Sequence, residues 1–405
     1  MPVVKSGGMT SELAAVGARR RRALNVVMHV DPRFGGICAT TPDFCRALEE
    51  TGTWEVATVA FREEGECSPF TPADGRLVLL PRGRMRWLRE SALRKRLEEE
   101  IAAADIVHVH GLWEEHTAEA CRLARRHGKP YLISAHGMLD PWAVRQKRWK
   151  KAIYAALIER RNLLRAACLR AVTPAEVNDY RLFGIDGRDV TVIPLGVRVP
   201  DRVDAREFLQ RYPALTGKRL VLFLGRLHRK KGLDLLCRAW LGVRRRVPEA
   251  HLVLAGPVAE DSRQLLESLI RETAIGDTVT LPGMLSGGLK WSALAAATVF
   301  VLPSYSENFA VAISEAMAVG CPVVVTRQCN RPEVAEAGAG WVIEPDVAQL
   351  EDKLVGALSL NESERVRVGG HGVRLVGKRY SWQAIGAQTA DVYSRILASS
   401  GSDCG

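Results

Sequence analysis

The chain has 405 residues, more than one hydrophobic core usually supports, so its length predicts two domains. Hydrophobic residues make up 47% and charged residues 25% of the sequence, as in ordinary folded globular proteins. No apolar run approaches the length of a membrane span, and the arginine run at 19–22 lacks the apolar core and cleavage site of a signal peptide. We therefore expect a cytoplasmic protein with a flexible leader over residues 1–23.

The net charge indicates which partners suit the chain, and the cysteine spacing indicates whether disulfides or a zinc site are expected. The net charge is +11, of which residues 1–200 carry +8. A basic first half suits an anionic substrate, a membrane surface or nucleic acid, although it can also be a solubilising surface. The nine cysteines are scattered and contain no C-x-x-C pair. This pattern argues against a disulfide framework and against a zinc site, and it suits a reducing cytosol.

Apolar runs rich in β-branched residues alternate with helical patterns along almost the whole chain. This alternation predicts parallel sheets covered by helices. A polar, proline-containing stretch at 197–218 separates two series of strands. The expected fold is therefore α/β, with two Rossmann-like, doubly wound domains over 24–200 and 201–380. The expected strands are 24–30, 55–61, 105–110, 131–136, 169–173 and 190–196, then 219–225, 251–256, 278–283, 298–304, 322–327 and 340–345.

The strongest motif is SYSENFAVAISEAMAVGCPVVVT at 304–326. A strand ends, a loop carries Glu307, and a helix that begins near Phe309 contains Glu315. The N-terminus of a helix offers unpaired N–H groups to phosphate oxygens, and carboxylates accept hydrogen bonds from sugar hydroxyls. The motif therefore predicts a site for a sugar diphosphate.

Two cations follow the first strand of the second series. Arg226 and Lys231, in the sequence GRLHRKKG, lie at the sheet edge where α/β proteins bind ligands. Fixed cations there would stabilise the charge that develops on a departing diphosphate. Because no D-x-D sequence follows a strand, we expect these side chains to act without a metal and without any cofactor.

The first domain contributes weaker signals. Gly35 and Gly36 form a turn after the first strand, where the backbone can approach a ligand, but G-x-G-x-x-G is absent and a dehydrogenase is disfavoured. His136 ends another strand at the ligand edge, and Asp140 follows as a further candidate. The neighbouring pair His108 and His110 alternates along a strand, and we expect it to be buried or hydrogen-bonded in structural roles.

The E-x7-E spacing of 307 and 315, followed by EAMAVGCPVV, resembles the signature of glycosyltransferase family 4, which comprises retaining enzymes of the GT-B fold. The spacing G-R-x4-K-G is similar to that family's phosphate-binding pair. VHVHGLW (107–113), the segment 133–151 and VTPAEVNDYRLFG (172–184) resemble a subgroup that builds bacterial surface polysaccharides.

This resemblance implies two domains facing a cleft, with the terminal helix 381–398 packed back on the first domain. It implies transfer of a hexosyl group, with retention, from a UDP- or GDP-sugar to a saccharide or lipid-linked acceptor. Glu315 would bind the ribose, and Glu307 and His136 the transferred sugar. The expected catalytic residues are His136, Glu307, Arg226 and Lys231. The expected donor-binding residues are Gly35, Gly36, Arg226, Lys231, Glu307, Asn308, Phe309, Ala310, Val311 and Glu315, where many members have Gly in place of Ala310.

A basic stretch within 142–154 is interleaved with aromatic residues, which suits either a solvated helix or peripheral contact with an anionic membrane at the inner face of the cell membrane. Its members are Arg145, Lys147, Arg148, Lys150 and Lys151, with Trp142, Trp149 and Tyr154. Three alternative functions stay open: a GT-B-like sugar-nucleotide epimerase, a phosphorylase and a nonspecific RNA-binding protein. The E-x7-E motif disfavours the first two, and the chain has no recognisable nucleic-acid module.

Overall fold

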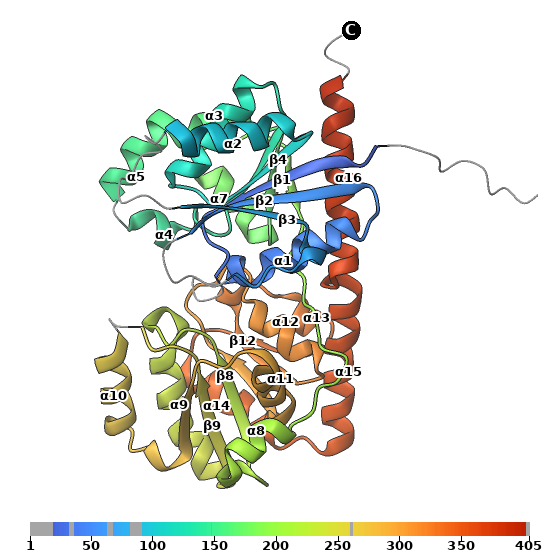
Figure 1. Ribbon diagram of the computed structural model, residues 1–405. Coiled ribbons are helices and arrows are strands. Elements are labelled where there is room, and N and C mark those ends of the chain that lie inside the picture. The colour runs from blue at the N-terminus through green and yellow to red at the C-terminus, as the bar shows by residue number, and fades with distance from the viewer. Residues whose placement is uncertain are drawn as a thin grey trace, which may run out of the picture.

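The computed structural model describes residues 19–31, 36–62, 68–81, 91–146, 148–259 and 262–401. Two parallel sheets, each flanked by helices, form two domains stacked along one long axis (Figure 1). This arrangement confirms the expected α/β fold with two Rossmann-like domains. Most of the expected leader lies outside the described residues, but its last residues, 21–23, belong to the first strand rather than to a flexible segment. Within them, no helix is both long enough and apolar enough to cross a membrane.

The first sheet has seven parallel strands in the order β3-β2-β1-β4-β5-β6-β7, so the direction of the strand order reverses between β1 and β4. Its strands are β1 (Arg21–Val27), β2 (Trp54–Arg62), β3 (Arg76–Pro81), β4 (Ile106–His110), β5 (Tyr131–Ser134), β6 (Cys168–Ala171) and β7 (Val190–Val192). The helices of this domain are α1 (Gly36–Glu49), α2 (Ser91–Ala103), α3 (Glu115–Arg126), α4 (Pro141–Arg145), α5 (Arg148–Tyr154), α6 (Arg160–Arg165) and α7 (Pro174–Leu182).

One strand of this sheet, β3, is not among the strands expected from the sequence. The edge strand β3 pairs with β2, and most of its residues are half-exposed or exposed. A strand at an edge needs less apolar surface than the central strands, all of whose residues are buried in β4 and β5. The pattern over 76–81 was therefore weaker than the others.

The second sheet has six parallel strands in the order β10-β9-β8-β11-β12-β13, with its reversal between β8 and β11. Its strands are β8 (Arg219–Leu224), β9 (Ala250–Ala255), β10 (Val279–Gly283), β11 (Val299–Leu302), β12 (Val323–Thr326) and β13 (Gly340–Ile343). Its helices are α8 (Arg206–Arg211), α9 (Leu233–Arg246), α10 (Arg263–Glu272), α11 (Gly287–Ala296), α12 (Val311–Ala318), α13 (Glu333–Glu336), α14 (Val347–Leu358) and α15 (Glu362–Arg379). Ligands of such sheets bind at the carboxyl ends of strands beside the reversal.

The chain passes between the domains twice, through segments that lie side by side. The backbone N–H of Val197 donates to the carbonyl of Tyr380 at 2.8 Å, and Gly196 lies so close to Trp382 that a Cβ there would overlap the indole ring. From this point α16 (Trp382–Gly401) returns along the first domain and packs on α1 (Figure 1). Apolar residues of α16 such as Tyr393 share a core with Trp54.

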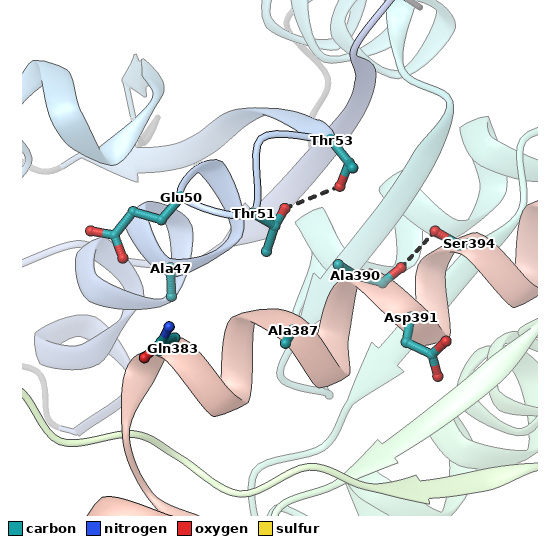
Figure 2. A pocket seen from close by; sticks show the side chains of 9 residues that line it. All are labelled: Ala47, Glu50, Thr51, Thr53, Gln383, Ala387, Ala390, Asp391 and Ser394. Carbon is teal, nitrogen blue, oxygen red and sulfur yellow. Dashed lines mark hydrogen bonds between the residues drawn. The ribbon is translucent and has the colours of Figure 1, made fainter. Parts of the chain in front are cut away.

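A hollow of about 650 Å³ lies in the seam between α1 and α16 (Figure 2). Its lining is mostly apolar and also includes polar side chains, from Glu50, Thr51, Thr53, Gln383, Asp391 and Ser394. None of the predicted site residues contributes to this lining, so the hollow is separate from the candidate site.

Candidate functional site

The loop after β11 carries Glu307 at the strand-order reversal of the second sheet. The carboxylate of Glu307 is buried, with 9% of the side chain exposed, and its Oε1 accepts a hydrogen bond of 2.6 Å from Ser304 Oγ. The same oxygen pairs with the ammonium group of Lys231. The structure therefore brings together two of the four predicted catalytic residues in one ion pair.

A glycine makes this pairing possible. Lys231 ends a short 3-10 turn after β8, and Gly232 follows with φ +69°. A Cβ at Gly232 would overlap the carbonyl oxygen of Pro303, at the end of β11. The absence of a side chain therefore lets the two loops approach closely enough for Lys231 to reach Glu307.

Arg226 lies two residues after β8, on the same side of the reversal as Lys231. It is exposed and makes no hydrogen bond or ion pair with any described residue. Its guanidinium is thus available to an anion that enters beside Glu307 and Lys231. Of the two predicted cations, Lys231 is paired and Arg226 is unpaired.

The loop from Glu307 to Ala310 is held from behind by the segment after β12. The side chain of Asn330 donates to the carbonyl of Glu307 at 2.7 Å. The buried Arg331 donates to the carbonyl of Phe309 at 3.1 Å and to Ser314 Oγ at 2.9 Å, while its guanidinium lies 4.6 Å from the Phe309 ring centroid. These contacts hold the carbonyls of Glu307 and Phe309 on the side away from the site, and residue type and spacing did not predict them.

The N–H groups on the other side of this loop stay open. Those of Asn308, Phe309 and Ala310 donate to no described residue, and α12 begins directly afterwards at Val311. Ala310 adopts the left-handed conformation, with φ +51° and ψ 72°, which favours glycine. This conformation explains why Gly at this position suits the motif better than Ala.

Glu315 lies one turn further along α12 and is also paired with a lysine. Lys290, on α11, places its ammonium nitrogen 2.6 Å from Glu315 Oε1, and both side chains are largely buried. Lys290 lies 25 residues before Glu315, in a helix that shows no charged pattern, so residue type and spacing did not predict this pair. Each carboxylate of the E-x7-E motif therefore has its own lysine.

The first domain contributes His136 to the candidate site. It follows β5 with φ +53°, is half-buried, and its Nε2 lies 3.0 Å from Nδ1 of the buried His110. Burial, together with the nearby Arg170 guanidinium, lowers the pKa of His136 to about 3. His136 is therefore neutral at physiological pH. The described residues contain no group of three His, Cys, Asp or Glu side chains placed to hold a metal ion.

The two histidines of β4 differ in their surroundings. His108 is buried and hydrogen-bonded to Tyr393 OH at 2.7 Å and to Ser134 Oγ at 2.8 Å, as a structural role requires. His110 is buried too, but it contacts the candidate residue His136 directly. The strand pattern therefore predicted the burial of both and missed the link from His110 to the site.

The two domains meet at the site. Ser306 Oγ donates to Asp140 Oδ2 at 2.9 Å, and a Cβ at Gly137 would lie 2.7 Å from Cβ of Asn308. The loop that contains His136 thus faces the loop that contains Glu307. Of the glycine pair in the first domain, Gly35 lies outside the described residues, and Gly36 begins α1 with open space where a Cβ would be.

The comparisons with known proteins agree with this geometry. The family model described as "Glycosyl transferase 4-like domain" matches residues 35–196, and the model "Glycosyl transferases group 1" matches residues 204–369. Together they cover every strand of both sheets except β1. The chain belongs to the family 4 group of GT-B glycosyltransferases. This membership favours glycosyl transfer over the epimerase, phosphorylase and RNA-binding interpretations.

The relatives of this glycosyltransferase match it over different shares of its length. The GDP-mannose:cellobiosyl-diphosphopolyprenol alpha-mannosyltransferase of Xanthomonas oryzae is 26% identical, over 93% of this chain and 97% of its own. The alpha-maltose-1-phosphate synthase of Mycobacterium tuberculosis is 29% identical, over 73% and 80%. An uncharacterized glycosyltransferase of Methanocaldococcus jannaschii is 32% identical, but the match spans only 45% of its length.

Solved structures share the fold at low identity. HepE of Anabaena, in complex with UDP and glucose, has a TM-score of 0.76 at 16% identity, over 93% of this chain and all of its own. Sucrose-phosphate synthase of Thermosynechococcus elongatus has a TM-score of 0.73 at 20% identity, over 94% and 100%. These likenesses establish the fold of this chain.

Proposed function

We propose that the protein transfers a hexosyl group from a UDP- or GDP-sugar to a saccharide acceptor in polysaccharide biosynthesis, in the cytoplasm. The observation that carries this proposal is the convergence near β8 and β11 of three cations, two carboxylates and an open helix N-terminus. A nucleotide sugar offers the complementary groups, namely a diphosphate between two sets of hydroxyls.

Each residue then has a definite task. The N–H groups from Asn308 to Val311 and the side chains of Arg226 and Lys231 would bind the diphosphate. Glu315 would accept hydrogen bonds from the ribose, and Glu307 from hydroxyls of the transferred sugar. The structures of HepE with UDP, and with UDP-glucose, support a nucleotide-sugar donor for this fold.

We propose that transfer proceeds with retention at the anomeric carbon. The acceptor oxygen bonds to the anomeric carbon, the bond from that carbon to the diphosphate oxygen breaks, and the departing diphosphate takes the acceptor's proton on the same face. Glu307 Oε1 already accepts hydrogen bonds from Ser304 and Lys231, which suits sugar binding better than nucleophilic attack. The protein would therefore contribute position and electrostatic stabilisation, with the cations in place of a metal.

A thermal-shift screen of UDP-, GDP- and ADP-sugars tests this proposal. A donor at 100 times its dissociation constant stabilises the folded state by about 2.7 kcal/mol, enough for a clear rise in melting temperature. No stabilisation by any nucleotide sugar would contradict the proposal. Transfer in excess EDTA should match transfer without it, and strict dependence on an added metal would remove the assignment of Arg226 and Lys231 as sufficient counter-charges.

The surface around α5 supports a lipid-linked acceptor. Between Arg148 and Arg165 the chain runs through α5, a π-helical turn and α6. Trp149, Ile153 and Leu157 recur there at four-residue spacing and are 75%, 63% and 71% exposed. Exposed apolar side chains among basic ones suit an anionic membrane surface. We propose that this apolar ridge, defined by those three residues, docks the protein on the inner face of the cell membrane.

One member of the basic stretch contacts the protein itself and not solvent on the ridge side. Lys151 donates to the carbonyl of Ala143 at 2.7 Å, and its ammonium lies 5.1 Å from the ring centroid of Trp113, so it faces the protein rather than the ridge. Lys147 lies outside the described residues. The proposed membrane contact therefore depends on Arg145, Arg148 and Lys150 rather than on the whole stretch.

Vesicle co-sedimentation with phosphatidylserine-containing liposomes tests the ridge. Replacing Trp149, Ile153 and Leu157 by Glu should abolish binding, because each cation contributes about 1 kcal/mol and each large apolar side chain about 1.5–3 kcal/mol when buried. Leu182→Glu is the matched control, since Leu182 is 76% exposed on α7 and outside the ridge. Equal binding by the ridge variant and the control would refute the contact.

A further inference from the structure

A row of hydrogen-bonded side chains connects His136 to the interior of the first sheet. His136 Nε2 lies 3.0 Å from His110 Nδ1, and His110 Nε2 lies 3.1 Å from Asn25 Oδ1. Asn25 is fully buried on β1, and its amide nitrogen donates toward Cys45 Sγ at 3.4 Å. The amide oxygen of Asn25 is therefore the group that faces His110.

This orientation decides where each ring proton lies. An amide oxygen only accepts hydrogen bonds, so His110 must carry its proton on Nε2. A neutral imidazole has a single N–H, so His110 Nδ1 accepts, and the proton between the two rings belongs to His136 Nε2. His136 Nδ1 then has a free lone pair, and it makes no hydrogen bond to any described residue.

The rings of His110 and His136 are both neutral at physiological pH. Burial lowers the pKa of His110 well below its usual value, and His136 and the Arg170 guanidinium lower it further. Arg170 itself is buried and donates to the carbonyls of Ile193 and Pro194, at 3.0 and 2.8 Å. This fixed positive charge, which lines a small cavity together with His110 and His136, disfavours a second one on either ring.

We propose that Asn25, acting through His110, holds His136 as the Nε2–H tautomer, so that His136 Nδ1 accepts a hydrogen bond from a hydroxyl of the transferred sugar. The inference rests on the proposed function, in which His136 contacts that sugar. A bare nitrogen selects a hydroxyl at this position of the sugar over a carboxylate or a carbonyl oxygen, which could only accept. Asn25 and His110 are thus positioning residues that determine specificity.

The neighbouring histidine supplies the contrast. His108 stacks on His110, with ring centroids 3.9 Å apart, but its partners are the hydroxyls of Tyr393 and Ser134. A hydroxyl can donate or accept, so neither partner fixes a tautomer. Ser134→Ala therefore removes a buried hydrogen bond beside the relay formed by Asn25, His110 and His136. It does not change the proton positions within that relay, which makes it a matched control.

Long-range ¹H–¹⁵N spectra of the full chain labelled with ¹⁵N-histidine distinguish protonated from bare ring nitrogens. At pH 7.5 the wild type should show a proton on Nε2 and none on Nδ1 for both His110 and His136. Asn25→Val should release both rings into mixed tautomers, because no fixed acceptor then faces His110 Nε2. A proton on His136 Nδ1 in the wild type, or an unchanged pattern in Asn25→Val, overturns the assignment. If Asn25→Val does not fold, Asn25→Ser takes its place, because a hydroxyl can donate or accept and therefore does not fix the tautomer of His110.

Kinetics with UDP-glucose and GDP-mannose test the contact with the sugar. Loss of one hydrogen bond predicts a fall in kcat/KM of about five-fold in Asn25→Val and no change in Ser134→Ala. Wild-type kcat/KM in Asn25→Val despite a changed tautomer would overturn the contact. Failure of any nucleotide sugar to bind the wild type would instead refute the proposed function, and the contact with it, while the spectra would still establish the tautomer.

Discussion

The ion pair of Lys231 with Glu307 predicts a measurable coupling. Replacing Lys231 by Met leaves the Glu307 carboxylate buried, with Ser304 as its remaining side-chain donor. A hydrogen bond to a charged group contributes about 1.5–3 kcal/mol, and breaking a fully buried pair costs about 3–5 kcal/mol. Because 23% of the Lys231 side chain is exposed, we expect the lower range, about 2 kcal/mol.

A double-mutant cycle isolates the interaction energy between Lys231 and Glu307 from the other effects of each substitution. Glu307→Gln removes the charge and keeps an acceptor for Ser304, so Lys231→Met together with Glu307→Gln should lose less stability than the two single changes added. We expect a coupling of at least about 1 kcal/mol from urea unfolding, beyond the 0.3–0.5 kcal/mol within which independent sites add. An additive result would mean that the ion pair does not form in solution.

The turnover number, kcat, tests whether Lys231 acts on the departing diphosphate. If Lys231 stabilises the departing diphosphate, Lys231→Met should lower kcat by about 10²–10³, as removal of one transition-state donor does elsewhere. Arg229→Met is the matched control, because Arg229 is an exposed cation in the same turn. A kcat for Lys231→Met as close to wild type as that of the control would refute its role at the diphosphate.

Three further outcomes follow from the site. Glu315→Ala should weaken donor binding by about 1.5–3 kcal/mol in calorimetry, with a smaller loss for Lys290→Met, and unchanged affinity in folded Glu315→Ala would exclude the ribose assignment. Ala310→Gly should raise stability by about 0.5 kcal/mol, because relief of a left-handed alanine, about 1–2 kcal/mol, exceeds the added freedom of the unfolded chain, and a lower denaturation midpoint would contradict this. The pKa of His136 is lowered to about 3, so between pH 6.5 and 3 the unfolded chain binds a proton that the folded chain does not. The free energy of unfolding should therefore fall as the pH drops below 6.5, by about 1–2 kcal/mol at pH 5. His136→Gln should remove that share of the loss.

Patterns that are local in sequence predicted the fold well. Buried parallel strands are apolar along their whole length, so the runs at 105–110 and 322–327 were visible without any tertiary information. The loop and helix of the E-x7-E motif are local for the same reason, because one strand, one loop and one helix follow each other in the chain. The half-exposed β3 lacked such a pattern.

Contacts between distant segments account for what the sequence did not reveal. Lys290 reaches Glu315 from another helix, and Arg331 reaches Phe309 from the segment after β12. The relay from Asn25 through His110 to His136 joins three strands that are neighbours only because the order of the sheet is β1-β4-β5. Residue type and spacing contain no information on such pairs until the order of the strands is known.

The two lysines of the site also resolve an electrostatic conflict within it. Carboxylates suit sugar and ribose hydroxyls, but two bare carboxylates beside the same helix N-terminus would repel a diphosphate. Lys231 and Lys290 each neutralise one of them, at Glu307 and Glu315. The unpaired Arg226 then adds a net positive charge, and the open N–H groups of the loop add their dipoles. The site can therefore hold carboxylates for the hydroxyls of a donor and still attract its anionic centre, which neither the acidic motif nor the basic turn achieves alone.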